Sequence, residues 1–273
     1  MFTRPYLYLA VITVIAIFSC GKSDNPQPET PKVDSLNAKF LLPVSHGFYT
    51  STSTGTVMFN PGGSTMMGLS YLNGRPNVRT GGLLAIVVSS GYSYIFSTLV
   101  YDTAVYNGNN ITLTTHYHGS GVIMNPNQRD LLLENGRLKR AVRAPDTTYF
   151  YYNAKNQPIK TETFSRSVHI TRSFVFDNSG NLQSVKSSST SQYDNQVISQ
   201  EEETFTGYDN KPNPLKGLWL WDDLYYRTVS ANNFSGYTYT QNTLQNGQVV
   251  ATTHQESTIP LVYTATGQLD CTR

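Results

Sequence analysis

The chain has 273 residues, and its 20 Lys and Arg nearly balance its 18 Asp and Glu. Charged residues make up 14% of the sequence and aromatic residues 12%. Together these values exclude a nucleic-acid binder that works through a strongly basic surface, a charged disordered tail and a coiled coil. They favour a globular β protein rich in Tyr and Thr.

The first twenty residues predict export. Arg4 and the amino terminus precede an apolar stretch over residues 6–18, which is shorter than the about 20 residues that a membrane-spanning helix needs. The stretch ends in Ile17-Phe18-Ser19-Cys20, which resembles the bacterial lipobox. We therefore expect residues 1–19 to be a lipoprotein signal peptide and Cys20 to carry the lipid, with chains such as palmitate inserted in the bilayer. The alternative is an ordinary secretory signal followed by a chance Cys.

Residues 20–35 predict a flexible, Pro-rich tether between the lipid and the folded part of the chain. Lys22 and Asp24, close to Cys20, resemble the charged start of Bacteroidota-type lipoproteins of the outer membrane. We expect a lipoprotein of that membrane, facing either the cell surface or the periplasm. Cys271 then has no partner for a disulfide, and we expect an inert, half-buried thiol.

Strand patterns dominate residues 36–273, for which we predict a single β-rich domain, with 36–135 and 136–273 as its alternative division into two halves. Short alternating or apolar runs are separated by Asn, Gly, Asp or Pro. These runs lie at residues 83–88, 93–100, 111–118, 147–152, 159–164, 169–176, 235–240, 248–253 and 259–264. They predict an all-β fold, an antiparallel meander of hairpins in one large twisted or curved sheet. At most one or two short helices are expected, at 127–134 and 214–225.

One type of turn recurs in the second half of the chain. An aromatic residue ends a strand, Asp or Asn opens the turn, and Gly or Asn takes the left-handed position before the next strand. The pattern is complete at residues 176–182 and recurs, with substitutions, at 152–157 and 263–269. Residues 208–214, Tyr-Asp-Asn-Lys-Pro-Asn-Pro, keep the aromatic-Asp opening and have Pro at the Gly position.

These turns resemble the Tyr-Asp repeats of RHS-like proteins. With the string at 208–214, they resemble more closely a group of Bacteroidota-type surface lipoproteins with Tyr-Asp hairpin repeats. The resemblance covers residues 136–273. It implies a fold and a location, and because the group has no established activity it assigns no functional residues.

Charged and metal-binding residue types form no complete site in the sequence. His116 and His118 point the same way on one strand, but the sequence cannot place a third ligand, such as His46 or His169, beside them. We therefore expect solvent-facing histidines, no metal and no cofactor. The acidic runs 201–203 and 222–223 put neighbouring carboxylates on opposite strand faces, whereas a glycosidase needs two about 5 to 10 Å apart across a cleft. We expect the acidic run 201–203 to lie on a solvated strand face. We expect the same of the basic cluster in residues 137–143.

The aromatic segment 219–226 is the best candidate for ligand binding. In an extended chain Trp219 and Trp221 lie on one face, where they would form a platform for sugar rings beside Tyr225, with Asp222 accepting hydrogen bonds from sugar hydroxyls. The alternative, which Trp's usual burial favours, is that the segment folds over the sheet and its indoles fill the core.

The sequence therefore predicts an outer-membrane-anchored lipoprotein that is not an enzyme. It would act as a binding or interaction module for a glycan or an outer-membrane protein, without nucleic acid. The alternative is a structural or transporter-accessory protein of the envelope that associates through sheet edges. A glycan hydrolase is the third candidate, and it requires acids or histidines that converge in one pocket.

Overall fold

The computed structural model describes residues 33–41, 57–59, 63–88, 91–118 and 127–273. The signal peptide, Cys20, most of the tether and His46 lie outside the described residues, so the predictions for them stay predictions.

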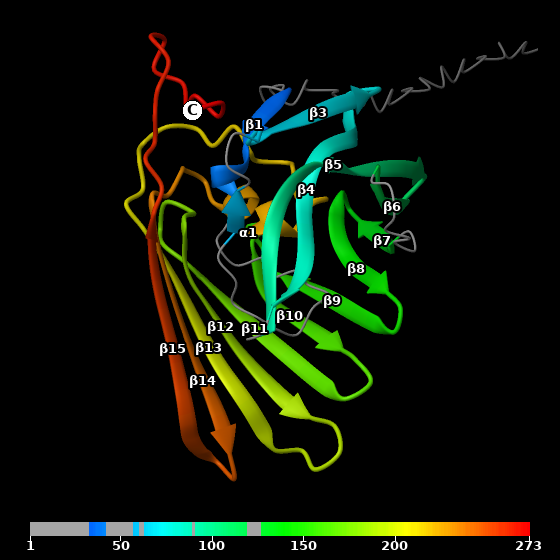
Figure 1. The fold of residues 1–273 in the computed structure, drawn as a ribbon, viewed down its shortest axis with the longest axis vertical. Coiled ribbons are helices and arrows are strands. Elements are labelled where there is room, and N and C mark those ends of the chain that lie inside the picture. Colours follow the sequence, from blue (N-terminus) through cyan, green and yellow to red (C-terminus); the bar gives the residue numbers. More distant parts are fainter. Residues whose placement is uncertain (1–32, 42–56, 60–62, 89–90, 119–126) are drawn as a thin grey trace, which may run out of the picture.

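The fold is an antiparallel β meander, as the sequence predicts (Figure 1). Its strands are β1 (Ser35–Asn37), β2 (Val57–Phe59), β3 (Met66–Leu72), β4 (Arg75–Val88), β5 (Gly91–Asn107), β6 (Asn110–Tyr117), β7 (Asn127–Glu134), β8 (Arg137–Arg143), β9 (Asp146–Tyr152), β10 (Pro158–Phe164), β11 (Val168–Phe176), β12 (Leu182–Ser191), β13 (Val197–Thr206), β14 (Gly236–Gln245) and β15 (Gln248–Thr258). From β3 onward each strand pairs with the next, β1 pairs with β3, and β2 pairs in parallel with β5. In the described part of the chain β1 and β15 are the two edges, so the curved sheet is open.

Alternation along the strands explains where the core lies. In β6, Ile111 and Leu113 are completely buried, while Thr112 and Thr114 between them are partly exposed. The two sides of residue 135 are joined in the same sheet, since β7 pairs with β8 through Leu131 and Ala141. One continuous sheet therefore connects the two halves that the sequence allowed as an alternative division.

Two of the sequence predictions for local structure are wrong. Residues 127–134 form β7 instead of a helix, because pairing with β6 and β8 buries Arg129 and Leu131 and exposes Gln128 and Asp130, a period of two. The predicted strand 259–264 is absent, and only an isolated bridge joins Tyr263 to Leu269 there.

Helical structure is short. The predicted helix over 214–225 begins later, as the 3-10 turn η2 (Asp222–Leu224) followed by α1 (Tyr225–Val229). A second 3-10 turn, η1 (Ala38–Phe40), follows β1. Within the described residues, no helix is long and apolar enough to cross a membrane.

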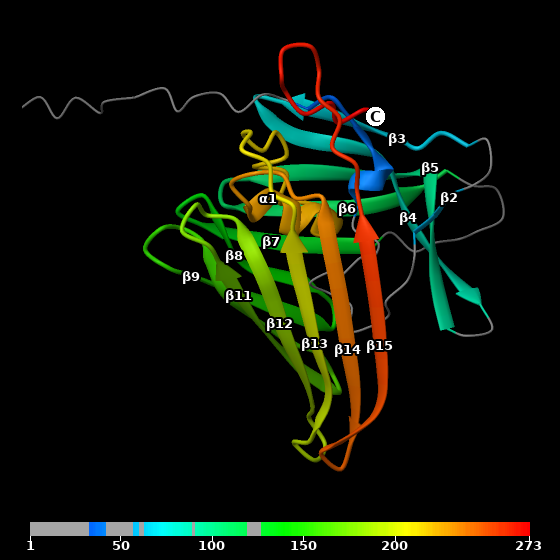
Figure 2. The ribbon, with the colours of Figure 1, turned by 90° about the vertical axis from the view of Figure 1, so that its left-hand side faces the viewer.

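The long connection between β13 and β14, residues 207–235, completes the core. It carries α1 at the end of the sheet away from the β14–β15 turn (Figures 1 and 2). Tyr226 packs edge-on against Phe205 and Phe174, with ring centroids 5.5 and 6.1 Å apart. Arg227 is buried and donates hydrogen bonds to the carbonyls of Phe40 and Phe234, which joins η1 to this connection. The connection is therefore held by contacts with the sheet on one side and with η1 on the other.

The recurring turn has one geometry at three places. In each, the backbone N–H of the opening residue donates to the carbonyl four residues later, and the opening side chain accepts from the N–H of that later residue. These pairs are Asn153 with Gln157, Asp177 with Asn181, and Thr264 with Gln268. The fourth residue of each turn has positive φ, namely Asn156, Gly180 and Gly267. The repeated sequence pattern thus forms the same turn, with the same hydrogen bonds, at these three positions.

Candidate functional site

A hollow of about 590 Å³ opens where the turns of three hairpins meet the connection 207–235. Its volume falls within the range of about 300 to 1,000 Å³ that is typical of ligand pockets. We call it the turn-end hollow. The side chains that matter for its chemistry are Arg137, Tyr152, Lys155, Lys216, Trp219 and Tyr225.

The β7–β8 and β9–β10 turns form one wall of the hollow. Asn135 and Gly136 both have positive φ, at 53° and 73°, as a two-residue hairpin turn requires, and Arg137 follows directly. The guanidinium carbon of Arg137 lies 4.9 Å from the ring centroid of Tyr152. Its Nη1 donates to Asn156 Oδ1 over 2.7 Å. These two contacts hold a cation at the wall.

The β11–β12 turn closes against the connection at Gly180. A Cβ added there would lie 3.5 Å from both Gln157 Nε2 and the Cβ of Ala231, and its φ of +86° favours glycine. The Ala231 N–H donates to the Gly180 carbonyl over 3.1 Å, and the Asn232 N–H donates to Asn181 Oδ1 over 2.9 Å. The β11–β12 turn is thus hydrogen-bonded to the connection.

The connection provides Lys216, Trp219 and Tyr225. Lys216 is exposed, Trp219 is half-buried and packs against the core, and Tyr225 is 2% exposed. Burial raises the pKa of Tyr152 to about 12, although the Tyr225 hydroxyl and Arg137 oppose the increase. The Tyr152 phenol is therefore neutral at physiological pH, and the charge of the wall comes from its cations.

The structure separates the four residues predicted to bind a ligand. Trp219 and Tyr225 line the turn-end hollow, whereas Trp221 and Asp222 do not. Trp221 is completely buried, and the guanidinium carbon of Arg79 lies 5.5 Å from its ring. The platform of two indoles is wrong because successive turns, with hydrogen bonds from Trp221 N–H to the Leu218 carbonyl and from Leu224 N–H to the Trp221 carbonyl, replace the extended chain.

Asp222 belongs to a buried ion cluster, which we define as Arg79, Asp102, Arg129, Asp222 and Asp223. Arg79 Nη1 lies 2.6 Å from Asp223 Oδ1, and Arg79 Nη2 lies 2.7 Å from Asp102 Oδ2. Arg129 lies 3.2 Å from Asp222 and 3.5 Å from Asp102. The cluster ties the connection to β4, β5 and β7, and within it Asp222 pairs with Arg129.

The acids of this cluster are perturbed in opposite directions. Burial would raise the pKa of Asp102, but Arg79 and Arg129 outweigh it and hold that pKa below its usual range. For Asp223, burial is the larger cause and raises the pKa, with Asp222 and Asp102 adding to it and Arg79 opposing it. The pairing with Arg79 therefore compensates only part of the burial of Asp223.

The acidic run in β13 also departs from the prediction of a solvated face. Glu202 is exposed and pairs with Lys186 at 3.2 Å, but Glu203 is 1% exposed and accepts a hydrogen bond from the Tyr237 hydroxyl over 2.8 Å. Alternation explains this, since Glu203 points the same way as buried Phe205. Burial raises the pKa of Glu203 to about 8, with Tyr237 opposing the increase.

The predicted histidine pair makes stacking contacts. Tyr101 stacks with both His116 and His118, with ring centroids 4.6 and 4.4 Å apart, and His116 Nε2 lies 3.0 Å from Thr103 Oγ1. No group of three His, Cys, Asp or Glu suited to a metal ion occurs among the residues that the structure describes. Cys271 is 7% exposed, and burial raises its pKa to about 11, so its thiol is protonated at neutral pH.

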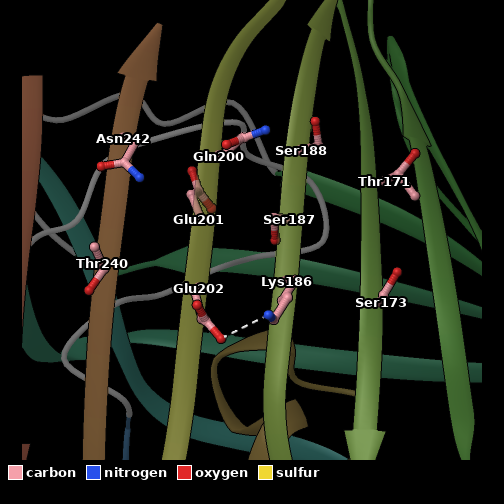
Figure 3. A pocket seen from close by; sticks show the side chains of 10 residues that line it. All are labelled: Thr171, Ser173, Lys186, Ser187, Ser188, Gln200, Glu201, Glu202, Thr240 and Asn242. Atoms are coloured by element: carbon pink, nitrogen blue, oxygen red, sulfur yellow. Dashed lines mark ion pairs between the residues drawn. The ribbon is translucent and has the colours of Figure 1, made fainter. Parts of the chain in front are cut away.

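A second hollow, of about 430 Å³, lies across β11 to β14 (Figure 3). Its lining is entirely polar or charged, and Lys186 and Glu202 within it are paired with each other. Among the described residues that line it, there is no aromatic ring for stacking, and its one cation, Lys186, is paired with a carboxylate. The turn-end hollow is therefore the better ligand site.

Sequence reasoning missed Tyr152, Lys155 and Lys216, and it placed Arg137 on a solvated strand face. The available signal was topological. In a meander, alternate turns lie at the same end of the sheet, so the turns after β7, β9 and β11 had to be neighbours. What the pattern could not provide is where the connection 207–235 folds back.

No family model and no curated protein matches the chain. Among solved structures, it is similar to a porin-like protein from Bacteroides vulgatus, with 13% identity, a TM-score of 0.37 and coverage of 71% of this chain and 88% of the other. A porin-like protein from Bacteroides uniformis matches with 9% identity, a TM-score of 0.37 and coverage of 71% and 89%.

Proposed function

We propose that the chain is a non-enzymatic binding module, held at the outer membrane by a lipid on Cys20, and that its turn-end hollow receives a saccharide. The observation that carries the proposal is half-buried Trp219 in the wall of an open hollow of about 590 Å³. Aromatic rings stack against the apolar faces of sugars, and polar side chains such as Asn156 and Gln157 can exchange hydrogen bonds with hydroxyls.

The distribution of carboxylates supports binding over hydrolysis. Glycoside hydrolysis requires two carboxyl groups that flank the scissile bond. No Asp or Glu is among the described residues that line the turn-end hollow. Asp222 and Asp223, which the sequence offered as a pair, hold Arg129 and Arg79 instead.

A glycan panel tests the binding part of the proposal. We expect the purified full-length protein to be retained by at least one immobilised glycan, and Trp219→Ala to weaken that binding at least tenfold while the protein stays folded. The matched control is Tyr193→Ala, an aromatic residue that is 83% exposed, lies in the β12–β13 turn and is outside the lining; this variant should leave retention unchanged. Retention by no glycan, or equal retention of wild type and Trp219→Ala, contradicts the proposal.

Fractionation tests the anchor. We expect the wild-type chain in the membrane fraction and a Cys20→Ser variant in the soluble fraction, because the acyl chains supply the membrane affinity. Identical fractionation of the two proteins, or an unmodified Cys20 in the mass spectrum, contradicts lipid anchoring.

A second candidate, a structural or transporter-accessory protein, is favoured by β15. This strand pairs with β14 on one side and with no other described strand, and its Val249 and Val250 are 55% and 56% exposed. Such an edge can pair with a strand of another protein. Crosslinking through residues of β15 in intact cells should then recover an outer-membrane partner, and its absence would remove this candidate.

A further inference from the structure

We propose that the saccharide bound in the turn-end hollow is anionic, with a carboxylate or sulfate on the ring that meets Trp219. This inference rests on the proposed function and narrows it to a class of ligand. Its basis is the charge of the lining and the fact that neighbouring carboxylates interact with groups outside the hollow.

Among the residues that the structure describes, the lining has three cations and no anion. Arg137, Lys155 and Lys216 face the hollow, and no Asp or Glu joins them among the described residues. The chain as a whole has 20 Lys and Arg against 18 Asp and Glu, so this excess is local. A concave surface lined by one sign of charge concentrates ligands of the opposite sign.

Glu134 and Asp177, which are close in sequence to residues of the lining, are engaged elsewhere. Asp177 accepts hydrogen bonds from the backbone N–H and the Nδ2 of Asn181, over 2.9 and 3.2 Å. Glu134 lies 2.9 Å from Lys139 Nζ. In the described part of the chain, neither carboxylate neutralises a cation of the hollow, and Arg137, Lys155 and Lys216 form no ion pair.

The three cations come from separate elements with different freedom. Arg137 is positioned by the Tyr152 ring and by Asn156. The planar guanidinium of Arg137 carries several N–H donors whose geometry matches a carboxylate or a sulfate. Lys155 lies in the β9–β10 turn and Lys216 in the connection, and both are exposed. We therefore expect Arg137 to orient the anionic group and the two lysines to attract it, with an attraction that salt screens.

Matched pairs of sugars test the charge requirement. The probes are oligogalacturonate and its fully methyl-esterified form, and a sulfated chondroitin oligosaccharide and its desulfated, carboxyl-reduced form. Titration calorimetry on the full-length protein should show at least one charged member binding about tenfold or more tightly than its neutral counterpart. The affinity of that charged member should also fall as NaCl rises from low to physiological concentration.

Charge-removing variants test the residues. Arg137→Gln, Lys155→Gln and Lys216→Gln should each weaken binding of the charged sugar by about twofold to fivefold, as partly exposed ion pairs do. The triple variant should bind the charged and neutral members of a pair equally. The matched control is Lys139→Gln, two residues from Arg137, outside the lining and already paired with Glu134; its affinity stays that of wild type.

The outcomes separate this inference from the proposed function. If a neutral sugar binds as tightly as its charged counterpart, or the triple variant binds the charged sugar like wild type, the charge requirement is wrong and saccharide binding stands. If a neutral glycan of the panel is retained and none of the charged probes binds, the charge requirement is wrong. If no probe binds and the panel retains no glycan while the protein is folded, both proposals fail.

Discussion

The connection 207–235 contacts two charged regions of the molecule, which differ in whether their cations are paired with carboxylates. In the buried ion cluster, Arg79 and Arg129 each contact a carboxylate of the connection, within 2.6 and 3.2 Å. In the turn-end hollow, Arg137, Lys155 and Lys216 contact no carboxylate among the described residues. The first region uses its charges to hold the fold together, and the second leaves its charges available to a ligand.

The two tryptophans of the chain show the same difference. Trp221 is completely buried beside the ion cluster, whereas Trp219 is half-buried and lines the hollow. Two residues of separation along a turn are enough to place one indole in the core and the other at the surface. Variants at matched positions in the two regions can therefore break or sharpen the comparison.

The largest expected effect on the free energy of unfolding comes from substitution of the tryptophans. Trp221→Ala should lower the free energy of unfolding by about 4 kcal/mol, because it leaves a cavity in the core and removes the ring from Arg79. Trp219→Ala should cost about 1 kcal/mol, since its ring is already part-solvated. Urea unfolding at equilibrium measures both values, and equal losses for the two variants would contradict the assignment of separate roles.

The next effect is at the arginines. Arg79→Met should cost about 3 kcal/mol, because Asp102 and Asp223 stay buried without their common partner. Arg137→Met should cost less than about 1 kcal/mol, as expected for a cation at the surface of the hollow. The same urea experiment compares them, and a larger loss for Arg137→Met would reverse the comparison.

A comparable effect, a loss of about 3 kcal/mol between pH 5 and pH 8, is expected from the titration of Glu203. Its pKa is raised from 4.5 to about 8 in the folded chain, so the folded state binds the proton more tightly than the unfolded state. Its contribution to stability is complete below pH 4.5 and is lost as pH rises towards 8. Wild type should thus lose stability between pH 5 and pH 8 relative to Glu203→Gln, which has no proton to release. Parallel pH profiles of the two proteins would contradict the buried, neutral carboxyl.

The smallest effect is in the recurring turn. Asp177→Ala removes the acceptor of the Asn181 N–H and should cost about 1 kcal/mol. Asn178→Ala, an exposed neighbour in the same turn, should change stability by less than about half that amount. Thermal unfolding resolves the two, and indistinguishable midpoints would show that the side chain of Asp177 does not stabilise the turn.

The sequence predicts most of the sheet and only half of the site. Alternation locates strands such as β6 and β11 because their buried and exposed residues follow the period of two. It fails for 127–134, where neighbouring strands override the local preference for a helix, and for 259–264, which makes a single bridge. Trp219 and Tyr225 were identified from residue type alone. Arg137, Lys155 and Lys216 were not, because their meeting depends on where the connection folds back.

The most direct test of the central claim observes the two indoles together. Since Trp219 and Trp221 are the only tryptophans in the chain, an NMR spectrum of the full-length protein contains two indole N–H signals, assigned with Trp219→Phe and Trp221→Phe. On saturation with the acidic oligosaccharide that binds in calorimetry, the Trp219 signal should shift and the Trp221 signal should stay in place. A shift of the Trp221 signal alone, or no shift of either signal at saturation, would contradict ligand binding in the turn-end hollow.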